Sequence, residues 1–188
     1  SSGAQGTAIA RALAALGAHV VFVTGPADVA PPEGVEVVRV QTAQQMSDAV
    51  DAALPAEAAV FAAAVADWRV ASQSDRKLKK TRDGMPKLEF AENPDILARV
   101  AQMATGRPGL VVGFAAETND VIENATAKRA RKGCDWIVAN DVSAATGIMG
   151  GTENAVVLIS DDGAESWPRM GKDAVARQLA DRIAAALA

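Results

Sequence analysis

Apolar runs rich in β-branched residues alternate with amphipathic helical segments along almost the whole chain, which predicts an α/β fold. Strands that alternate with helices of about 10–15 residues usually form parallel crossovers, so we expect a Rossmann-like, doubly wound, mostly parallel sheet with a C-terminal β-hairpin. No linker or internal repeat divides the 188 residues. Residues 1–188 are therefore predicted to form one domain, which buries roughly 70% of its extended-chain surface.

The first half of the chain predicts two helices and three strands. Apolar side chains recur every three or four residues in each helix, Gly17 follows the first helix, and Thr42 opens the second. The strands are short β-branched or alanine-rich runs, and the small residues of the third indicate helices on both of its faces. In chain order the elements are a helix at 6–16, strands at 19–24 and 35–40, a helix at 42–53 and a strand at 58–64.

The alternation breaks between Asp67 and Phe90, where polar and basic residues and an Asp83-Gly84 turn take its place. It resumes at Pro94, which suits the first turn of a helix, and Asp161-Asp162-Gly163 predicts the turn of a hairpin. The elements of the second half are a helix at 94–103, a strand at 109–114, a helix at 117–132, a strand at 136–139, hairpin strands at 155–160 and 165–168, and a helix at 172–188.

Composition excludes several classes of protein. The apolar content of 49% and the net charge of −4 exclude a disordered chain, and no apolar run approaches about 18 residues, so no membrane span is predicted. The first residues do not form a secretory signal. Cys134 is the only cysteine and His19 the only histidine, which excludes an internal disulfide and leaves little for a zinc site. A pI near 5.0 argues against nucleic-acid binding, and we expect a cytoplasmic protein.

Two segments suit the binding of phosphates. Ser1-Ser2-Gly3-Ala4-Gln5-Gly6 opens a helix, where backbone N–H groups and the helix N-terminus attract an anion; an ordinary glycine-rich helix entry fits the same residues. The densest positive stretch, Lys77-x-Lys79-Lys80, can close over a triphosphate or be a solvated run of charges. The first segment lacks the full Gly-x-Gly-x-x-Gly pattern, which disfavours a simple NAD site.

Polar residues also follow the predicted strands, at the sheet edge where open α/β folds bind ligands. Asp67 can accept a hydrogen bond from a ribose or substrate hydroxyl, help to hold a metal, or cap the loop after it. Asn93 is suited to the N-cap of the next helix, whose amides can also meet an anion. Phe114 can stack on a nucleobase or pack in the core, and Asn140 ends a later strand at the same edge.

Two lysines and the cysteine complete the candidates. Lys128 and Lys132 are four residues apart and therefore share one helix face, where they suit a polyphosphate if they line a cleft, or solubility if they face outward. Cys134 is expected to be a small core residue, and His19 to be structural.

Six segments occur together in an order that resembles the phosphopantothenoylcysteine synthetase domain of bacterial bifunctional coenzyme A biosynthesis proteins. They are Ser1-Ser2-Gly3-x-x-Gly6, Ala63-Ala64-Val65-Ala66-Asp67-Trp68, Lys77-x-Lys79-Lys80, Asn93-Pro94-Asp95-Ile96, Gly113-Phe114-Ala115-Ala116-Glu117-Thr118 and Ala139-Asn140-Asp141-Val142-Ser143. The resemblance implies a ligase that joins 4′-phosphopantothenate to L-cysteine. CTP would activate the carboxylate as an acyl-cytidylate with release of pyrophosphate, and cysteine would then displace CMP.

The resemblance also implies roles for individual residues. Lys77 and Asp67 would be catalytic. The positions that would bind the nucleotide are Ser1, Gly3, Gly6, Phe61, Ala62, Ala63, Asp67, Lys77, Pro94, Asp95, Ile96, Leu97, Phe114, Lys128, Lys132 and Asn140. Mg²⁺ is expected with the triphosphate, but no residue pattern names its ligands, and FMN is not expected because the flavin-dependent decarboxylase half is absent from these residues. The family implies a homodimer, in which the segment from Ala63 to Asp67 can face the neighbour's site, and a longer bifunctional chain.

This sequence departs from the family at two places. Ala4 stands where the family often has a basic residue, and the family's strand and Asn that precede Ser1 are not among these residues, so we expect a domain without its first strand. Two alternatives remain open: an NAD(P)-dependent oxidoreductase on the same fold, and a catalytically silent nucleotide-binding or dimerisation module.

Overall fold

A mixed five-stranded sheet forms the centre of the protein in the computed structural model, which describes residues 2–71, 88–142 and 153–188. The strand order is β10-β9-β7-β6-β3. β3, β6 and β7 are mutually parallel, β9 is antiparallel to β7, and β10 is antiparallel to β9. The strands are β3 (Ala58–Phe61), β6 (Leu110–Glu117), β7 (Trp136–Asp141), β9 (Val156–Ser160) and β10 (Gly163–Ser166). The predicted α/β class and C-terminal hairpin are confirmed, but the sheet is mixed rather than mostly parallel.

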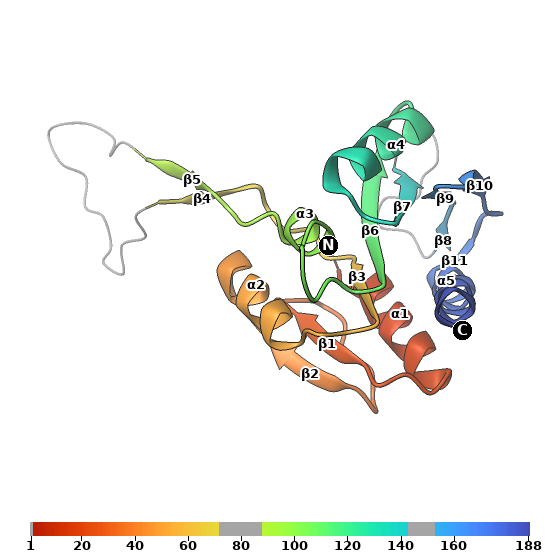
Figure 1. Cartoon of the computed structure of the whole chain (residues 1–188), viewed down its shortest axis with the longest axis horizontal. Helices are drawn as coiled ribbons and strands as arrows, with labels where there is room; N and C mark the ends of the chain where they lie inside the picture. Colours follow the sequence, from red (N-terminus) through yellow and green to blue (C-terminus); the bar gives the residue numbers. More distant parts are fainter. Residues whose placement is uncertain (1, 72–87, 143–152) are drawn as a thin grey trace, which may run out of the picture.

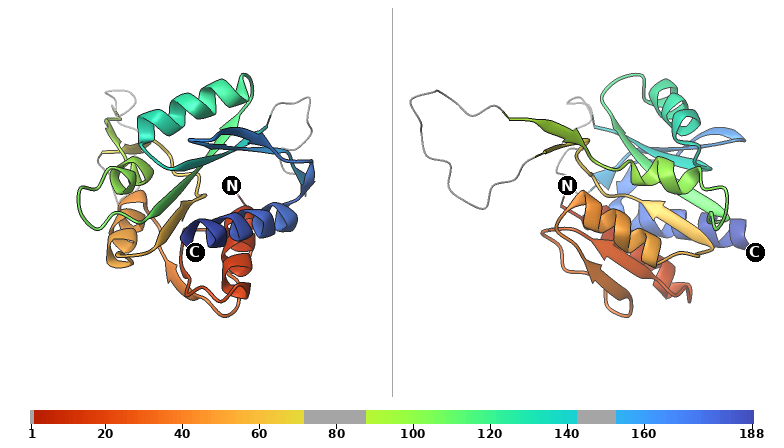
Figure 2. Two further views of the ribbon diagram at one scale, coloured as in Figure 1. Left: turned by 45° about the vertical axis from the view of Figure 1, so that its right-hand side comes forward. Right: turned by 60° about the vertical axis from the view of Figure 1, so that its left-hand side comes forward.

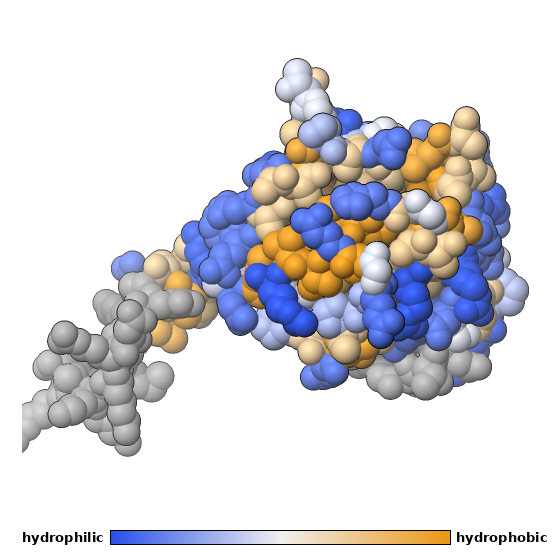
Figure 3. Space-filling model, turned by 90° about the horizontal axis from the view of Figure 1, so that it is seen from below, coloured by the Kyte–Doolittle hydropathy of each residue, from blue (hydrophilic) through white to orange (hydrophobic). Residues whose placement is uncertain are grey.

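A separate parallel pair lies beside β3. β1 (Val21–Thr24) pairs with β2 (Glu36–Arg39), and no pairing joins β1 to β3 among the described residues. Both β1 and β3 are only half-buried along their length. Figure 3 looks at the molecule from the side on which β1 and β2 lie in Figure 1, and it shows apolar residues gathered in the middle of that side.

Helices cover both faces of the main sheet (Figure 2). α1 and α5 lie on one face and pack against each other, while α2, α3 and α4 lie on the other face. Their bounds are α1 (Ala4–Ala15), α2 (Ala43–Ala52), α3 (Ile96–Ala101), α4 (Val121–Lys132) and α5 (Lys172–Leu187). No helix in the described ranges is long and apolar enough to cross a membrane.

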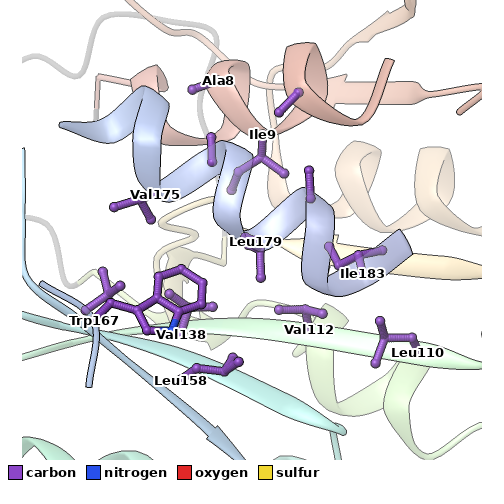
Figure 4. Packing of buried hydrophobic residues seen from close by; sticks show 14 residues of the cluster. Ala8, Ile9, Leu110, Val112, Val138, Leu158, Trp167, Val175, Leu179 and Ile183 are labelled. Atoms are coloured by element: carbon purple, nitrogen blue, oxygen red, sulfur yellow. The ribbon is translucent and has the colours of Figure 1, made fainter. Parts of the chain in front are cut away.

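Two cores fill the spaces between the helices and the sheet. The first lies under α1 and α5, where Val175, Leu179 and Ile183 of α5 pack between Ile9 and the strands (Figure 4). The second core lies under α2, α3 and α4 and includes the fully buried Ile137. Burial of each aliphatic side chain contributes about 1.5–3 kcal/mol to the stability of the fold. These two layers of side chains therefore hold the helices against the sheet.

A two-stranded arm projects from the body between β3 and α3 (Figure 1). β4 (Trp68–Val70) pairs antiparallel with β5 (Phe90–Glu92). The break in the sequence pattern predicted irregular structure here, because three-residue strands are too short to show periodicity. The sequence pattern also did not predict a second small pair of strands, β8 (Glu153–Asn154) with β11 (Met170–Gly171).

Several predicted boundaries move for local reasons. β6 runs to Glu117, because its last residues pair with β7, and α4 therefore begins at Val121 rather than at 117. The second hairpin strand begins at Gly163, whose φ of 112° suits the turn, instead of at 165. Cys134 is a buried core residue as expected, and burial raises the pKa of its thiol.

Candidate nucleotide and substrate site

The carboxyl ends of β3, β6 and β7 meet at one edge of the sheet because the three strands are parallel. Phe114 lies in β6 opposite Val138, and Asn140 lies two residues further along β7, opposite Ala116. The Oδ1 atom of Asn140 is buried and has no hydrogen-bond partner within the described ranges. An acceptor left in this state at a sheet edge is available to a ligand donor.

Lys132 and Asp95 join α4 to the N-terminus of α3. The Lys132 ammonium donates to Asp95 Oδ2, and Asp95 Oδ1 accepts from the Ala98 N–H at 3.1 Å, so this carboxylate caps α3. Burial raises the pKa of Asp95, but the Lys132 ammonium and the Ala98 N–H outweigh it and hold the pKa below its usual value. The predicted N-cap, Asn93, is therefore wrong: Asp95 performs that role, which places Pro94 before the helix.

Lys128 lies one turn before Lys132 on the same face of α4 and turns toward the sheet. Its Nζ donates to the Phe114 carbonyl oxygen at 3.0 Å. Phe114 itself is partly buried and packs against the first core, which favours the core-packing alternative for its ring. Both ammonium groups thus turn toward β6 and α3 and bond protein oxygens there, so the alternative of an outward-facing, solubilising pair is not favoured.

Asp67 lies at the base of the arm rather than directly at the end of β3. The strand ends at Phe61, and residues 62–66 have no regular structure before Trp68 begins β4. The Asn93 N–H donates to the Asp67 carbonyl oxygen at 2.8 Å, which joins this segment to the residues just before α3. Asp67 is exposed, so its carboxylate is accessible to a ligand.

The glycine-rich entry to α1 comes close to the same edge. Gly3 is the N-cap of α1 with φ of 79°, and a Cβ atom there would lie 2.8 Å from the Ala27 Cβ, so only glycine fits. A Cβ on Gly6 would lie 3.8 Å from the Phe22 ring and 3.9 Å from the Ala62 Cβ. The start of α1 thus touches both β1 and the segment that follows β3.

The remaining candidates fall into three groups. Ile96 and Leu97 point into the second core, so only their backbone is available to a ligand. Ser1 and Lys77 lie outside the described residues. Ala62 and Ala63 lie in the segment just after β3.

Sequence reasoning missed two contacts at the base of the arm. The Asn93 side chain bonds the Ala66 carbonyl oxygen at 2.8 Å, and Arg69 reaches both Glu92 and Asn93. No local signal could have found them, because the extended backbone that Pro94 imposes on Asn93 also suits an N-cap.

The described residues contain no cluster of three or more metal-ligating side chains. Asp95 already bonds Lys132 and Ala98, and the other described carboxylates near the ends of β3, β6 and β7, which are Asp67, Glu117 and Asp141, form no such cluster. Such a donor set suits an ion that is held mainly by phosphate oxygens and water, as Mg²⁺ usually is, and does not suit an all-protein metal cage.

The chain matches the model of the family described as "DNA/pantothenate metabolism flavoprotein C-terminal domain" over residues 1–187. It is 41% identical to the coenzyme A biosynthesis bifunctional protein CoaBC of Vibrio parahaemolyticus and 42% identical to that of Escherichia coli. Each alignment covers 97% of this chain and 46% of the relative, so the chain spans just under half the length of these relatives.

Solved structures give the same likeness. The crystal structure of the C-terminal domain of a CoaBC protein matches with a TM-score of 0.79 and 34% identity, over 97% of this chain and 82% of that one. A Cab2 variant in complex with phosphopantothenate-cysteine matches with a TM-score of 0.71 and 16% identity, over 100% of this chain and 78% of that one. The second likeness concerns the fold alone.

Proposed function

This chain belongs to the DNA/pantothenate metabolism flavoprotein C-terminal domain family, and on that premise we propose that it joins 4′-phosphopantothenate to L-cysteine with CTP. The observation that carries the proposal is the family match along nearly the whole chain, together with the Lys128 and Lys132 ammonium groups that lie beside β6 and the start of α3. In this proposal the chain is a phosphopantothenate–cysteine ligase.

The proposed reaction has two steps. A carboxylate oxygen of phosphopantothenate attacks the α-phosphorus of CTP, and the bond to the β-phosphate breaks with release of pyrophosphate. The amine nitrogen of cysteine then attacks the acyl carbon, the bond to CMP breaks, and the amide forms as the amine loses a proton. Both steps increase charge on phosphate oxygens, which fixed cations stabilise.

Each candidate residue is proposed to have its own role in these two steps. Lys128 and Lys132 would bind the phosphates, and Lys77 would stabilise the charge that develops during activation. Asp67 would accept from a hydroxyl of the nucleotide or of phosphopantothenate, and Asn140 Oδ1 offers a buried acceptor at the same edge. Mg²⁺ would enter with the triphosphate and neutralise part of its charge.

Nucleotide titration followed by an assay tests the proposed function. CTP in the presence of Mg²⁺ is expected to raise the Tm, by mass action on the folded state, more than ATP or NAD⁺ does. Release of pyrophosphate is then expected only when phosphopantothenate and CTP are both present, and the ligated product only when cysteine is added. A Tm shift with NAD⁺ alone would favour the oxidoreductase alternative instead.

We also propose that residues 1–188 form one Rossmann-like domain whose sheet takes a further strand between β1 and β3. The support is that each strand lacks a partner on one edge within the described residues, while Gly6 of α1 lies near both Phe22 of β1 and Ala62, the residue that follows β3. A parallel strand there would join the two sheets into one. The titration is therefore to be repeated with the chain extended by an N-terminal strand, for which we expect a higher Tm and stronger CTP binding.

The projecting arm supports a homodimer as part of the same proposal. Trp68, Leu88 and Phe90 are 57%, 56% and 63% exposed, and the register of β4 and β5 puts Trp68 and Phe90 on one face of the arm. An isolated two-stranded hairpin is marginally stable in water, so an apolar arm of this kind needs a covering surface. A second copy of the chain is the occupant we propose.

Polar substitutions on the arm test the dimer. The double variant Trp68→Ser/Phe90→Ser is expected to sediment as a monomer at concentrations where the wild type is a dimer, because it removes the largest exposed apolar side chains of the arm. Leu16→Ser is the matched control, since Leu16 is 52% exposed at the end of α1. A wild-type monomer, or a variant dimer, would contradict the proposal.

The cytoplasm, within a longer bifunctional chain, is the setting we propose for this activity. The relatives carry the word bifunctional in their names, and the chain corresponds to under half of each.

A further inference from the structure

Asn93 is bonded to the peptide groups on both sides of Asp67. Its side-chain Nδ2 donates to the Ala66 carbonyl oxygen, and its backbone N–H donates to the Asp67 carbonyl oxygen, each at 2.8 Å. The first carbonyl belongs to the peptide that precedes the Asp67 Cα, and the second to the peptide that follows it. Together the two bonds fix the direction in which the Asp67 side chain leaves the backbone.

The segment before Asp67 has little else to hold it. Residues 62–66 have no regular structure, and most of them are exposed. Within the described part of the chain, the Asn93 amide gives the only hydrogen bond to this segment. Fixing the backbone of each residue costs conformational entropy, so a segment with so few bonds samples many positions once the Asn93 side-chain amide is removed.

The contacts around residue 93 favour an amide side chain over an acidic or a small one. The following Pro94 restricts Asn93 to extended backbone, which directs its N–H toward Asp67. Its Oδ1 lies 3.4 Å from Arg69 Nη1, and that same Nη1 donates to the Glu92 carbonyl oxygen. An aspartate at this position would place a carboxylate oxygen against the Ala66 carbonyl, and an alanine would leave that carbonyl without its partner.

We propose that Asn93 is a positioning residue for the ligation, which holds Asp67 beside the N-terminus of α3, where Asp95 and Lys132 meet. The inference rests on the proposed function, in which Asp67 touches the nucleotide or phosphopantothenate. It assigns Asn93 no contact with substrate. Asn93 acts through the Ala66 and Asp67 carbonyls, and loss of its side-chain amide lets the Asp67 carboxylate move away from the N-terminus of α3.

A double-mutant cycle tests this role. Asn93→Ala is expected to lower kcat/KM for ligation about 10- to 100-fold, since misplacing a catalytic group by about 1 Å costs on that order. Asp67→Asn is expected to cost at least as much. The double variant should match Asp67→Asn within about twofold, because Asn93 has no other route to the reaction. Multiplied losses in the double variant would overturn the proposal.

Asn124→Ala is the matched control, because the Asn124 Nδ2 also donates to a backbone carbonyl, that of Asn119, at 2.9 Å. It is expected to ligate like the wild type. Isosteric Asn93→Asp is expected to behave like Asn93→Ala, since it keeps the size of the side chain and removes the donor. Wild-type rates in Asn93→Asp would show that size rather than the hydrogen bond matters, and would overturn the inference.

Amide hydrogen exchange provides a readout that does not depend on activity. Asn93→Ala is expected to speed exchange of the amide of residue 93, whose N–H donates to the Asp67 carbonyl oxygen, and to leave the strands of the main sheet unchanged. Unchanged exchange at residue 93 would overturn the inference even if ligation fell. Absence of ligation in the wild type would instead contradict the proposed function, and faster exchange in Asn93→Ala would then reduce Asn93 to a structural role.

Discussion

Lys77→Gln is expected to reduce CTP-dependent ligation by about 10²–10³-fold, the usual cost of losing one group that stabilises charge in the transition state. Lys77 lies outside the described residues, so this expectation rests on the Lys77-x-Lys79-Lys80 pattern and on the proposed function. The glutamine retains a side chain of similar length without the charge. The measurement is pyrophosphate release at saturating CTP, together with the Tm of each variant.

Arg76→Gln is the matched control for Lys77, because it removes one positive charge from the same stretch of sequence. The Tm of both variants is expected to equal that of the wild type. Equal losses in the two variants would mean that the stretch contributes only its summed charge. Full activity of Lys77→Gln would contradict the catalytic role of this lysine.

Gly113→Val is expected to destabilise the protein by about 1–3 kcal/mol, the cost of overpacking a close-packed core. A Cβ on Gly113 would lie 2.6 Å from Leu97 Cδ2 and 2.8 Å from Ile137 Cδ1, and Ile137 is fully buried. Leu97 belongs to α3, so relief of the clash moves the helix that carries Asp95 at its N-terminus. Binding of CTP is therefore expected to weaken along with stability.

Urea denaturation and a CTP titration check this prediction, with a loss in Tm of about 2–4 °C for each kcal/mol. In the double variant Leu97→Ala/Gly113→Val, the shorter side chain at residue 97 makes room for the valine. This variant is expected to recover part of the CTP binding that Gly113→Val alone loses. A Gly113→Val variant with wild-type stability would show that Leu97 and Ile137 relax without cost, which would contradict the close approach of α3.

The fold could be predicted where its signal is local. Each main strand is an apolar run bounded by a turn, and each helix except α3 has two or more turns of periodic apolar residues, so the alternation was sufficient for the α/β class and the hairpin. The arm and the β8–β11 pair could not be predicted, because strands of two or three residues carry no period. The N-cap of α3 was assigned to Asn93 instead of Asp95, since both are good caps and only the neighbouring Ala98 and Lys132 distinguish them.

Asn140 could be placed near the carboxyl end of its strand from the sequence alone, because a strand's end depends on neighbours along the chain, whereas Asp67 belongs to the base of an arm that no local pattern indicates. The bonds that the site residues make depend instead on the tertiary structure. Lys132 and Asp95 are 37 residues apart in the sequence, and Asn93 reaches Ala66 across 27. Such pairs depend on how α3, α4 and the arm pack around the sheet, and packing direction is a property of the whole core rather than of any local pattern.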